Sequence, residues 1–137
     1  MAFNSRSLNG IRLLIIDKSD RIIFYLKEML MNEENIDSIY SATSVKDAKA
    51  IMETQMPDAV IIDLFLELKK GVELLEWIKL LSKNTFIIVF TNLSDKLHRE
   101  TAKNLGADYF LDKSFEFEKL PVIISELSYT RIAHDIL

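Results

Sequence analysis

Four polar side chains lie where apolar runs of this sequence end, and their types suggest a common chemistry. Asp17 follows the first apolar run, Asp63 the third and Thr91 the fourth, and Lys113 lies just beyond the fifth. Two carboxylates can hold a hard divalent cation such as Mg²⁺, with waters completing its shell. A hydroxyl and an ammonium are donors that suit a tetrahedral anion. Brought together, these four groups could hold a phosphoryl group on a carboxylate oxygen.

The apolar runs themselves predict five short strands, because each is short and bounded by polar residues. The expected strands cover Ile11–Ile16, Ile36–Ala42, Ala59–Ile62, Phe86–Phe90 and Ala107–Leu111.

A segment of helical apolar spacing follows each expected strand. Ser19 or Asp20, Ser44 and Ser94 are candidate N-caps for the first, second and fourth helices. The third helix is expected over Val72–Leu81, after a loop spanning Leu64–Gly71, and the last begins near Leu120 with Pro121 in its first turn. Gly106 is a natural residue to end the fourth helix.

Alternating strands and helices of this kind predict an α/β fold with a doubly wound, mostly parallel sheet. Strands that are apolar on both faces need helices on both sides of the sheet. In such sheets the functional site lies beyond the carboxyl ends of the strands. The four polar residues are therefore expected to meet at one edge. The chain of 137 residues is expected to be a single domain, with its core at about 11–135.

The composition excludes several classes of protein. The chain is 49% hydrophobic and 28% charged, it has no cysteine, and its net charge is −4. No apolar run approaches the ~20 residues of a membrane span, and the first residues lack a signal-peptide core. Scattered basic residues argue against direct nucleic-acid binding. A cytoplasmic location is the expectation.

The polar residues at the strand ends lie within longer motifs. The order of these motifs along the chain resembles that of the response-regulator receiver family. The matching segments are Ile15-Ile-Asp17, Ile61-Ile-Asp63-Leu64, Gly71-Val-Glu-Leu-Leu75, Phe90-Thr91-Asn92 and Gly106-Ala-Asp-Tyr-Phe-Leu-Asp-Lys113-Ser114. The resemblance extends from roughly Ile11 to Leu127.

The resemblance implies a flavodoxin-like (βα)5 domain with strand order 2-1-3-4-5, and it implies a role for each residue. Asp63 would accept a phosphoryl group from a phosphohistidine on a sensor histidine kinase or a phosphotransfer protein. Asp17 would hold Mg²⁺ together with Asp63. Thr91 and Lys113 would contact the phosphoryl group, and Phe110 would be the switch aromatic. The surface of the fourth helix, fifth strand and last helix would contact an output partner. Such a domain assists only its own phosphotransfer and is not an enzyme with a released small-molecule product.

The sequence departs from the family pattern at three positions. Lys18 replaces the second of two adjacent acids, Glu67 replaces a loop proline, and Ser114 replaces the proline after the lysine. The usual site sums to a charge of −2 before metal, whereas two acids and two lysines sum to zero here. At ~5 Å and an effective dielectric near 20, unit charges interact by roughly 3 kcal/mol. Lys18 is therefore expected to weaken Mg²⁺ binding, or to pair with Asp63 and do part of the cation's work.

Lys18 also keeps a second hypothesis open, namely a pseudo-receiver that binds partners without phosphorylation of Asp63. A flavodoxin-like ligand-binding domain is a third alternative, but the loop Asp17–Asp20 lacks the glycines of a phosphate cradle. The kinase and the output partner are not identifiable from the sequence. Apolar residues at Ile123, Ile124 and Leu127 exceed one buried stripe, which suggests a homodimer through the last helix.

Overall fold

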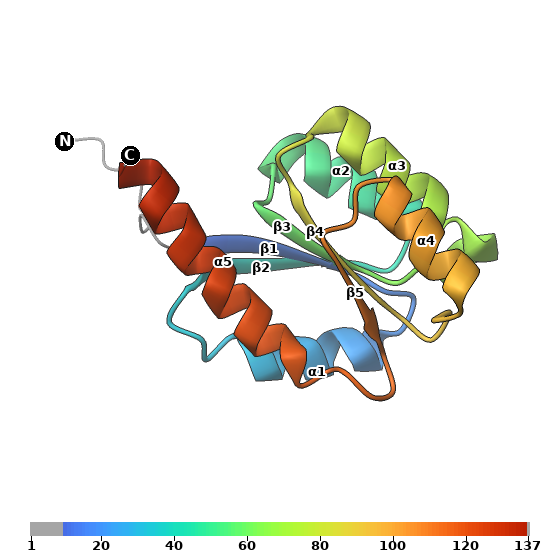
Figure 1. Cartoon of the computed structure of the whole chain (residues 1–137), viewed down its shortest axis with the longest axis horizontal. Coiled ribbons are helices and arrows are strands. Elements are labelled where there is room, and N and C mark those ends of the chain that lie inside the picture. Colours follow the sequence, from blue (N-terminus) through green and yellow to red (C-terminus); the bar gives the residue numbers. More distant parts are fainter. Residues whose placement is uncertain (1–9, 137) are drawn as a thin grey trace.

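A five-stranded parallel sheet lies between two layers of helices in the computed structural model of the chain (Figure 1). The structure describes residues 10–136, and among side chains those of residues 10–127. The strand order is β2-β1-β3-β4-β5, so the predicted doubly wound α/β fold is confirmed. The elements are β1 (Ile11–Ile16), α1 (Asp20–Leu30), β2 (Ile36–Ala42), α2 (Val45–Gln55), β3 (Ala59–Ile62), a 3₁₀ turn (Glu67–Lys69), α3 (Gly71–Leu81), β4 (Phe86–Thr91), α4 (Lys96–Asn104), β5 (Tyr109–Asp112) and α5 (Lys119–Ile136).

Two apolar cores form because alternate residues of the strands point to opposite faces of the sheet. Leu14, Val60 and Val89 pack under α2, α3 and α4, whereas Ile15 and Ile61 pack under α1 and α5. Figure 1 shows α1 and α5 on one side of the sheet and the other three helices on the opposite side. β1, β3 and β4 are therefore apolar on both faces, as expected of central parallel strands. None of the described helices is long and apolar enough to span a membrane.

Local sequence signals place the starts of α1 and α2. The Ser19 hydroxyl accepts a hydrogen bond from the Ile22 amide, and the Ser44 hydroxyl accepts one from the Asp47 amide, as N-cap residues do. The prediction that Ser94 caps α4 is wrong. Asp95 caps this helix, and Ser94 instead donates from its hydroxyl to Asp112 Oδ2 at 2.6 Å.

α4 ends at a Schellman motif that also delays the start of β5. Gly106 has a φ of +106°, its amide donates to Lys103 O, and the Ala107 amide donates to Ala102 O. Because Ala107 completes this turn, β5 begins at Tyr109, two residues later than the sequence predicted. Asp108 then pairs with β4 through its side chain, since Asp108 Oδ2 accepts from the Ile87 amide at 2.8 Å.

The start of α3 lies against the end of β3. A Cβ built on Gly71 would lie 2.4 Å from Leu64 Cα and 2.6 Å from the Asp63 carbonyl oxygen. Only glycine permits so close an approach of helix to strand. This contact fixes the helix directly behind Asp63.

Candidate functional site

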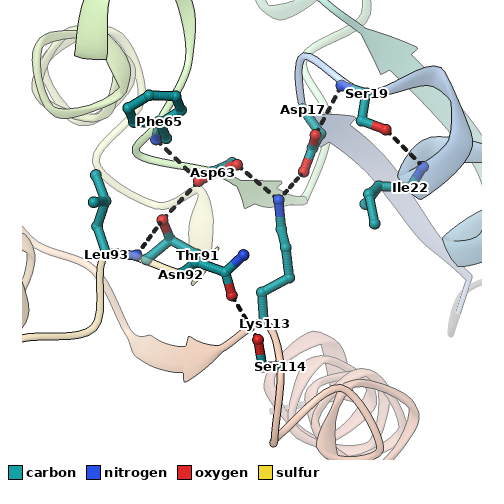
Figure 2. Close-up of polar contacts among 10 residues, drawn as sticks. All are labelled: Asp17, Ser19, Ile22, Asp63, Phe65, Thr91, Asn92, Leu93, Lys113 and Ser114. Carbon is teal, nitrogen blue, oxygen red and sulfur yellow. Dashed lines mark hydrogen bonds and ion pairs between the residues drawn. The ribbon is translucent and has the colours of Figure 1, made fainter.

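Asp63 lies at the carboxyl edge of β3 and is 4% exposed (Figure 2). Its Oδ1 accepts hydrogen bonds from the Thr91 hydroxyl at 2.6 Å and from the Phe65 amide at 2.9 Å. Its Oδ2 accepts one from Lys113 Nζ at 2.7 Å. Side chains from β3, β4 and the end of β5 therefore meet here, because neighbouring parallel strands end at the same edge of the sheet.

Lys113 joins Asp63 to a second buried carboxylate, that of Asp17 after β1. Lys113 Nζ donates to Asp17 Oδ2 at 2.6 Å, and Asp17 Oδ1 accepts from the Ser19 amide at 2.9 Å. Burial lowers the pKa of Lys113, but its hydrogen bonds and charge interactions with the two carboxylates raise the pKa above its usual value. A single ammonium therefore neutralises part of the charge of two acids held side by side.

Hydrogen bonds connect the loops after β4 and β5 to this site and to each other. Thr91 is fully buried, and its hydroxyl also accepts a hydrogen bond from the Leu93 amide at 3.2 Å. Ser114 donates from its hydroxyl to Asn92 Oδ1 at 2.9 Å, which ties the two loops together (Figure 2). A change at Asp63 can thus reach the start of α4 through Thr91.

Lys18 lies at the rim of the site and contacts an aromatic ring. Its Nζ is 3.9 Å from the centroid of the Phe65 ring, and the described residues include no ion pair between Lys18 and Asp63. The direct pairing considered from the sequence is therefore not seen in this structure. The Phe65 contact itself had no sequence signal, because it depends on the path of the loop after β3.

Glu67, which replaces the usual loop proline, bonds to a different element. Its Oε1 accepts a hydrogen bond from the Val45 amide, the first residue of α2, at 2.8 Å. The next two residues, Leu68 and Lys69, have positive φ values of 48° and 61°. Glu67 thereby links the loop that follows Asp63 to the N-terminus of α2, where a carboxylate is favoured by the helix dipole.

Comparison with known families identifies the chain at this point. The family model described as the response regulator receiver domain matches residues 13–125. The chain belongs to the response regulator receiver family. It is accordingly a receiver domain of two-component signalling, the kind of domain that interacts with histidine kinases or phosphotransfer proteins and with output domains.

Individual relatives agree with this assignment. The chain is 29% identical over 118 residues to a protein-glutamate methylesterase/protein-glutamine glutaminase of Clostridium acetobutylicum, covering 82% of this chain and 34% of that protein. It thus spans about a third of the length of this relative.

Solved structures share the fold. A CheY-like receiver protein from Methanospirillum hungatei matches with a TM-score of 0.81 and 23% identity, covering 91% of this chain and 98% of the other. The receiver domain of a DNA-binding response regulator from Colwellia psychrerythraea matches with a TM-score of 0.80 and 25% identity, covering 86% and 98%.

Phe110, which the sequence predicted to be the switch aromatic, lies on β5 beneath α4. Phe110 is half-buried, and the Arg99 guanidinium of α4 stacks on its ring, with Cζ 4.7 Å from the centroid. Arg99 also lies 3.9 Å from Glu116, whose Oε1 accepts from the Asp112 amide at 2.9 Å. The sequence did not single out Arg99 or Glu116, because a charged residue on a helix surface has no distinctive spacing.

Receiver domains generally bind Mg²⁺ at the acidic site, and in this chain Asp17 and Asp63 are the buried acids there. Within the part of the chain that the structure describes, no group of three or more acidic or histidine side chains is placed to hold a metal. Both carboxylates already give one oxygen to Lys113, and Lys18 adds a second ammonium at the rim. The two acids and the two lysines together carry no net charge.

Proposed function

We propose that this receiver domain accepts a phosphoryl group on Asp63 from a phosphohistidine of a sensor histidine kinase or phosphotransfer protein. A carboxylate oxygen of Asp63 forms a bond to phosphorus while the bond from phosphorus to the imidazole nitrogen breaks. The imidazole leaves with that electron pair and is protonated by solvent or by its own protein. The product is an acyl phosphate on Asp63.

The observation that carries this proposal is the set of donors around one buried carboxylate. The Lys113 ammonium and the Thr91 hydroxyl lie 2.7 and 2.6 Å from the two oxygens of Asp63. Both donors are already held in place, Lys113 by Asp17 and Thr91 by its strand. Donors fixed near the oxygens where negative charge accumulates stabilise a phosphoryl group without reorganisation.

The proposed output is a change of the surface formed by α4, β5 and α5. When Asp63 carries a phosphoryl group, the Thr91 hydroxyl would bond to a phosphoryl oxygen instead of the free carboxylate. Leu93, whose amide donates to that hydroxyl, would move with it at the start of the loop to α4. Phosphorylation then favours one arrangement of this surface because the phosphoryl group binds that arrangement better. An output partner would read the arrangement around Phe110.

The sequence predicted a homodimer through α5 from its apolar residues. In the structure these residues expose little apolar surface. Ile123 and Ile124 are buried in the chain's own core, and Val122 is their exposed neighbour at 57%. Leu127 is partly buried against the same core. Homodimerisation through α5 therefore stays a prediction, and among the described side chains of this helix Val122 is the exposed apolar one.

The experiment that tests the proposal measures intact mass after incubation with phosphoramidate, a small donor with a P–N bond. The parent chain should gain one phosphoryl group, and Asp63→Asn should gain none. Asp20→Asn is the matched control, because Asp20 is an exposed acid in the nearby first turn of α1. Equal labelling of the parent chain and Asp63→Asn would refute the assignment. Absence of labelling in folded protein, also with a phosphohistidine donor, would favour the pseudo-receiver.

A further inference from the structure

Lys18 is the cation at the mouth of the site that carries no carboxylate partner among the described residues. It follows Asp17 directly, it is exposed, and its ammonium rests on the Phe65 ring at 3.9 Å from the centroid. Phe65 in turn donates its backbone amide to Asp63 Oδ1 at 2.9 Å. The residue whose ring the Lys18 ammonium contacts is therefore hydrogen-bonded to the proposed phosphoacceptor, which links Lys18 to the loop beside Asp63.

We propose that Lys18 is a catalytic residue that takes the place of the divalent cation, moving from the Phe65 ring to the phosphoryl group as it is transferred to Asp63. This inference rests on the proposed function of Asp63. Position 18 lacks the second acid that helps to hold the metal in other receivers. On this inference, the lysine at the same position supplies the positive charge that the metal would have supplied.

The charges of the site support this exchange. Asp17 and Asp63 contribute −2, and Lys113 and Lys18 contribute +2, so the resting site is neutral. A phosphoryl group replaces the single charge of Asp63 by a charge of about −1.5 to −2. Lys113 is already shared between the two carboxylates at 2.6 and 2.7 Å. Among the side chains that the structure describes at this site, Lys18 is then the cation left to meet the added negative charge.

The relative strengths of the two contacts give the direction of the movement. An exposed ammonium is held only weakly by the face of a phenyl ring. A hydrogen bond between an ammonium and a phosphoryl oxygen is charge-assisted on both sides and is much stronger. The lysine stem is long and flexible, so Lys18 can leave the ring without a change of backbone. Phe65 therefore keeps the cation near the site when no phosphoryl group is present and does not compete for it afterwards.

The test measures the initial rate of phosphoryl incorporation from phosphoramidate, by intact mass, in excess EDTA and in excess Mg²⁺. The parent chain should be labelled in EDTA at a rate within about threefold of its rate in Mg²⁺, because the protein supplies its own cation. Lys18→Gln should lower the EDTA rate by about tenfold or more, as expected for a lost charge on a transferring phosphoryl group. Lys46→Gln, an exposed lysine of α2, should leave both rates unchanged.

A second measurement follows the movement itself through a Phe65→Trp variant. The emission of the introduced indole should change when Asp63 is phosphorylated, because the Lys18 ammonium leaves its face. The same change should be absent from a Phe65→Trp variant that also carries Lys18→Gln. Trp77 is present in both proteins, so its emission cancels in the comparison.

The outcomes separate this inference from the proposed function. Labelling of Asp63 that requires Mg²⁺ and is equal in the parent chain and Lys18→Gln would overturn the role of Lys18 and leave the function of Asp63 intact. Absence of labelling under every condition, with a phosphohistidine donor included, would overturn both. An emission change that persists without Lys18 would refute the movement even if the rates behaved as expected.

Discussion

Lys113 holds two buried carboxylates together with one ammonium, at the point where three strands end. Its side chain is 13% exposed, and those of Asp17 and Asp63 are 3% and 5% exposed. Two acids this close would repel one another without it, because water screens their charges only partly at such depth. The resting stability of the site therefore depends on the residue that also contacts the proposed phosphoryl group.

Replacement of Lys113 by methionine should lower the free energy of unfolding by about 2–4 kcal/mol at neutral pH without metal, since breaking a buried ion pair leaves charge unpaired. Because the two carboxylates raise the pKa of Lys113, the loss should be fully present below the ordinary lysine pKa and should shrink as the pH rises through the raised pKa, where the ammonium is lost. Urea denaturation at several pH values measures both effects. A Lys113→Met/Asp63→Asn double variant should recover part of the loss, and equal losses in both variants would contradict the explanation.

Lys18 should set the affinity of the site for Mg²⁺. In Lys18→Asp the site regains a third acid, and an attraction replaces a repulsion of roughly 3 kcal/mol before screening. The Mg²⁺ dissociation constant should fall by about tenfold or more on this reasoning. Titration calorimetry measures it, with Lys46→Asp as a control for the same change in net charge. A similar gain in the control would show that the effect is not local to the site.

At the residue scale, the sequence predicted the contacts between residues at strand ends. It did not predict the contacts that depend on the conformation of a loop. Asp17, Asp63, Thr91 and Lys113 meet because parallel strands end at one edge of a sheet, which the apolar runs already indicated. The stacking of Lys18 on Phe65 arises instead from the conformation of a loop. No local pattern encodes such a contact between residues so far apart in the chain.

At the scale of elements, the junction of β3 and α3 positions Asp63 from behind. Gly71 was part of a motif in the sequence, and the structure gives the physical reason for a glycine there. A Cβ at this position would lie 2.5 Å from the Leu64 carbonyl oxygen. The backbone of the strand end would have to shift, and Asp63 with it.

Substitution of Gly71 by alanine should therefore lower the free energy of unfolding by roughly 1–3 kcal/mol, the usual cost of overpacking. Thermal or urea denaturation measures it. The sign of the change decides the matter, because alanine stabilises a helix by about 1 kcal/mol relative to glycine where there is room for its methyl group. A more stable variant would show that α3 has space at this point.

The element boundaries show why caps and ends are harder to predict than the elements themselves. Ser94 and Asp95 are both good N-cap residues, and the choice depends on a distant partner, since Ser94 bonds to Asp112 on β5. Glu67 similarly bonds to Val45, 22 positions away. Such long-range partners cannot be read from local spacing.

At the scale of the whole molecule, one chain of contacts joins the site to the α4–β5–α5 surface. Thr91 bonds to Asp63 and to the Leu93 amide, and Arg99 of α4 stacks on Phe110 of β5. Arg99 also lies near Glu116, at the start of the segment leading to α5. A rearrangement around Thr91 is therefore expected to reach all three elements.

Phosphorylation should change the backbone amide resonances of α4 and β5 as well as those of the loops beside Asp63. Spectra of ¹⁵N-labelled protein before and after addition of phosphoramidate measure this directly. The largest distant changes are expected at Arg99 and Phe110, because their contact depends on the position of α4. Asp63→Asn with the same donor should show no such changes. Changes confined to the loops at the site would contradict a transmitted switch.

Chemical mapping of the modified residue tests most directly whether Asp63 is the phosphoacceptor. Borohydride reduces an aspartyl phosphate to homoserine, so reduction of the phosphorylated chain marks the modified residue permanently. Peptide mass spectrometry should then find homoserine at position 63 and an unchanged aspartate at position 17. Homoserine at another position, or none after phosphorylation has been detected by intact mass, would contradict the assignment of Asp63.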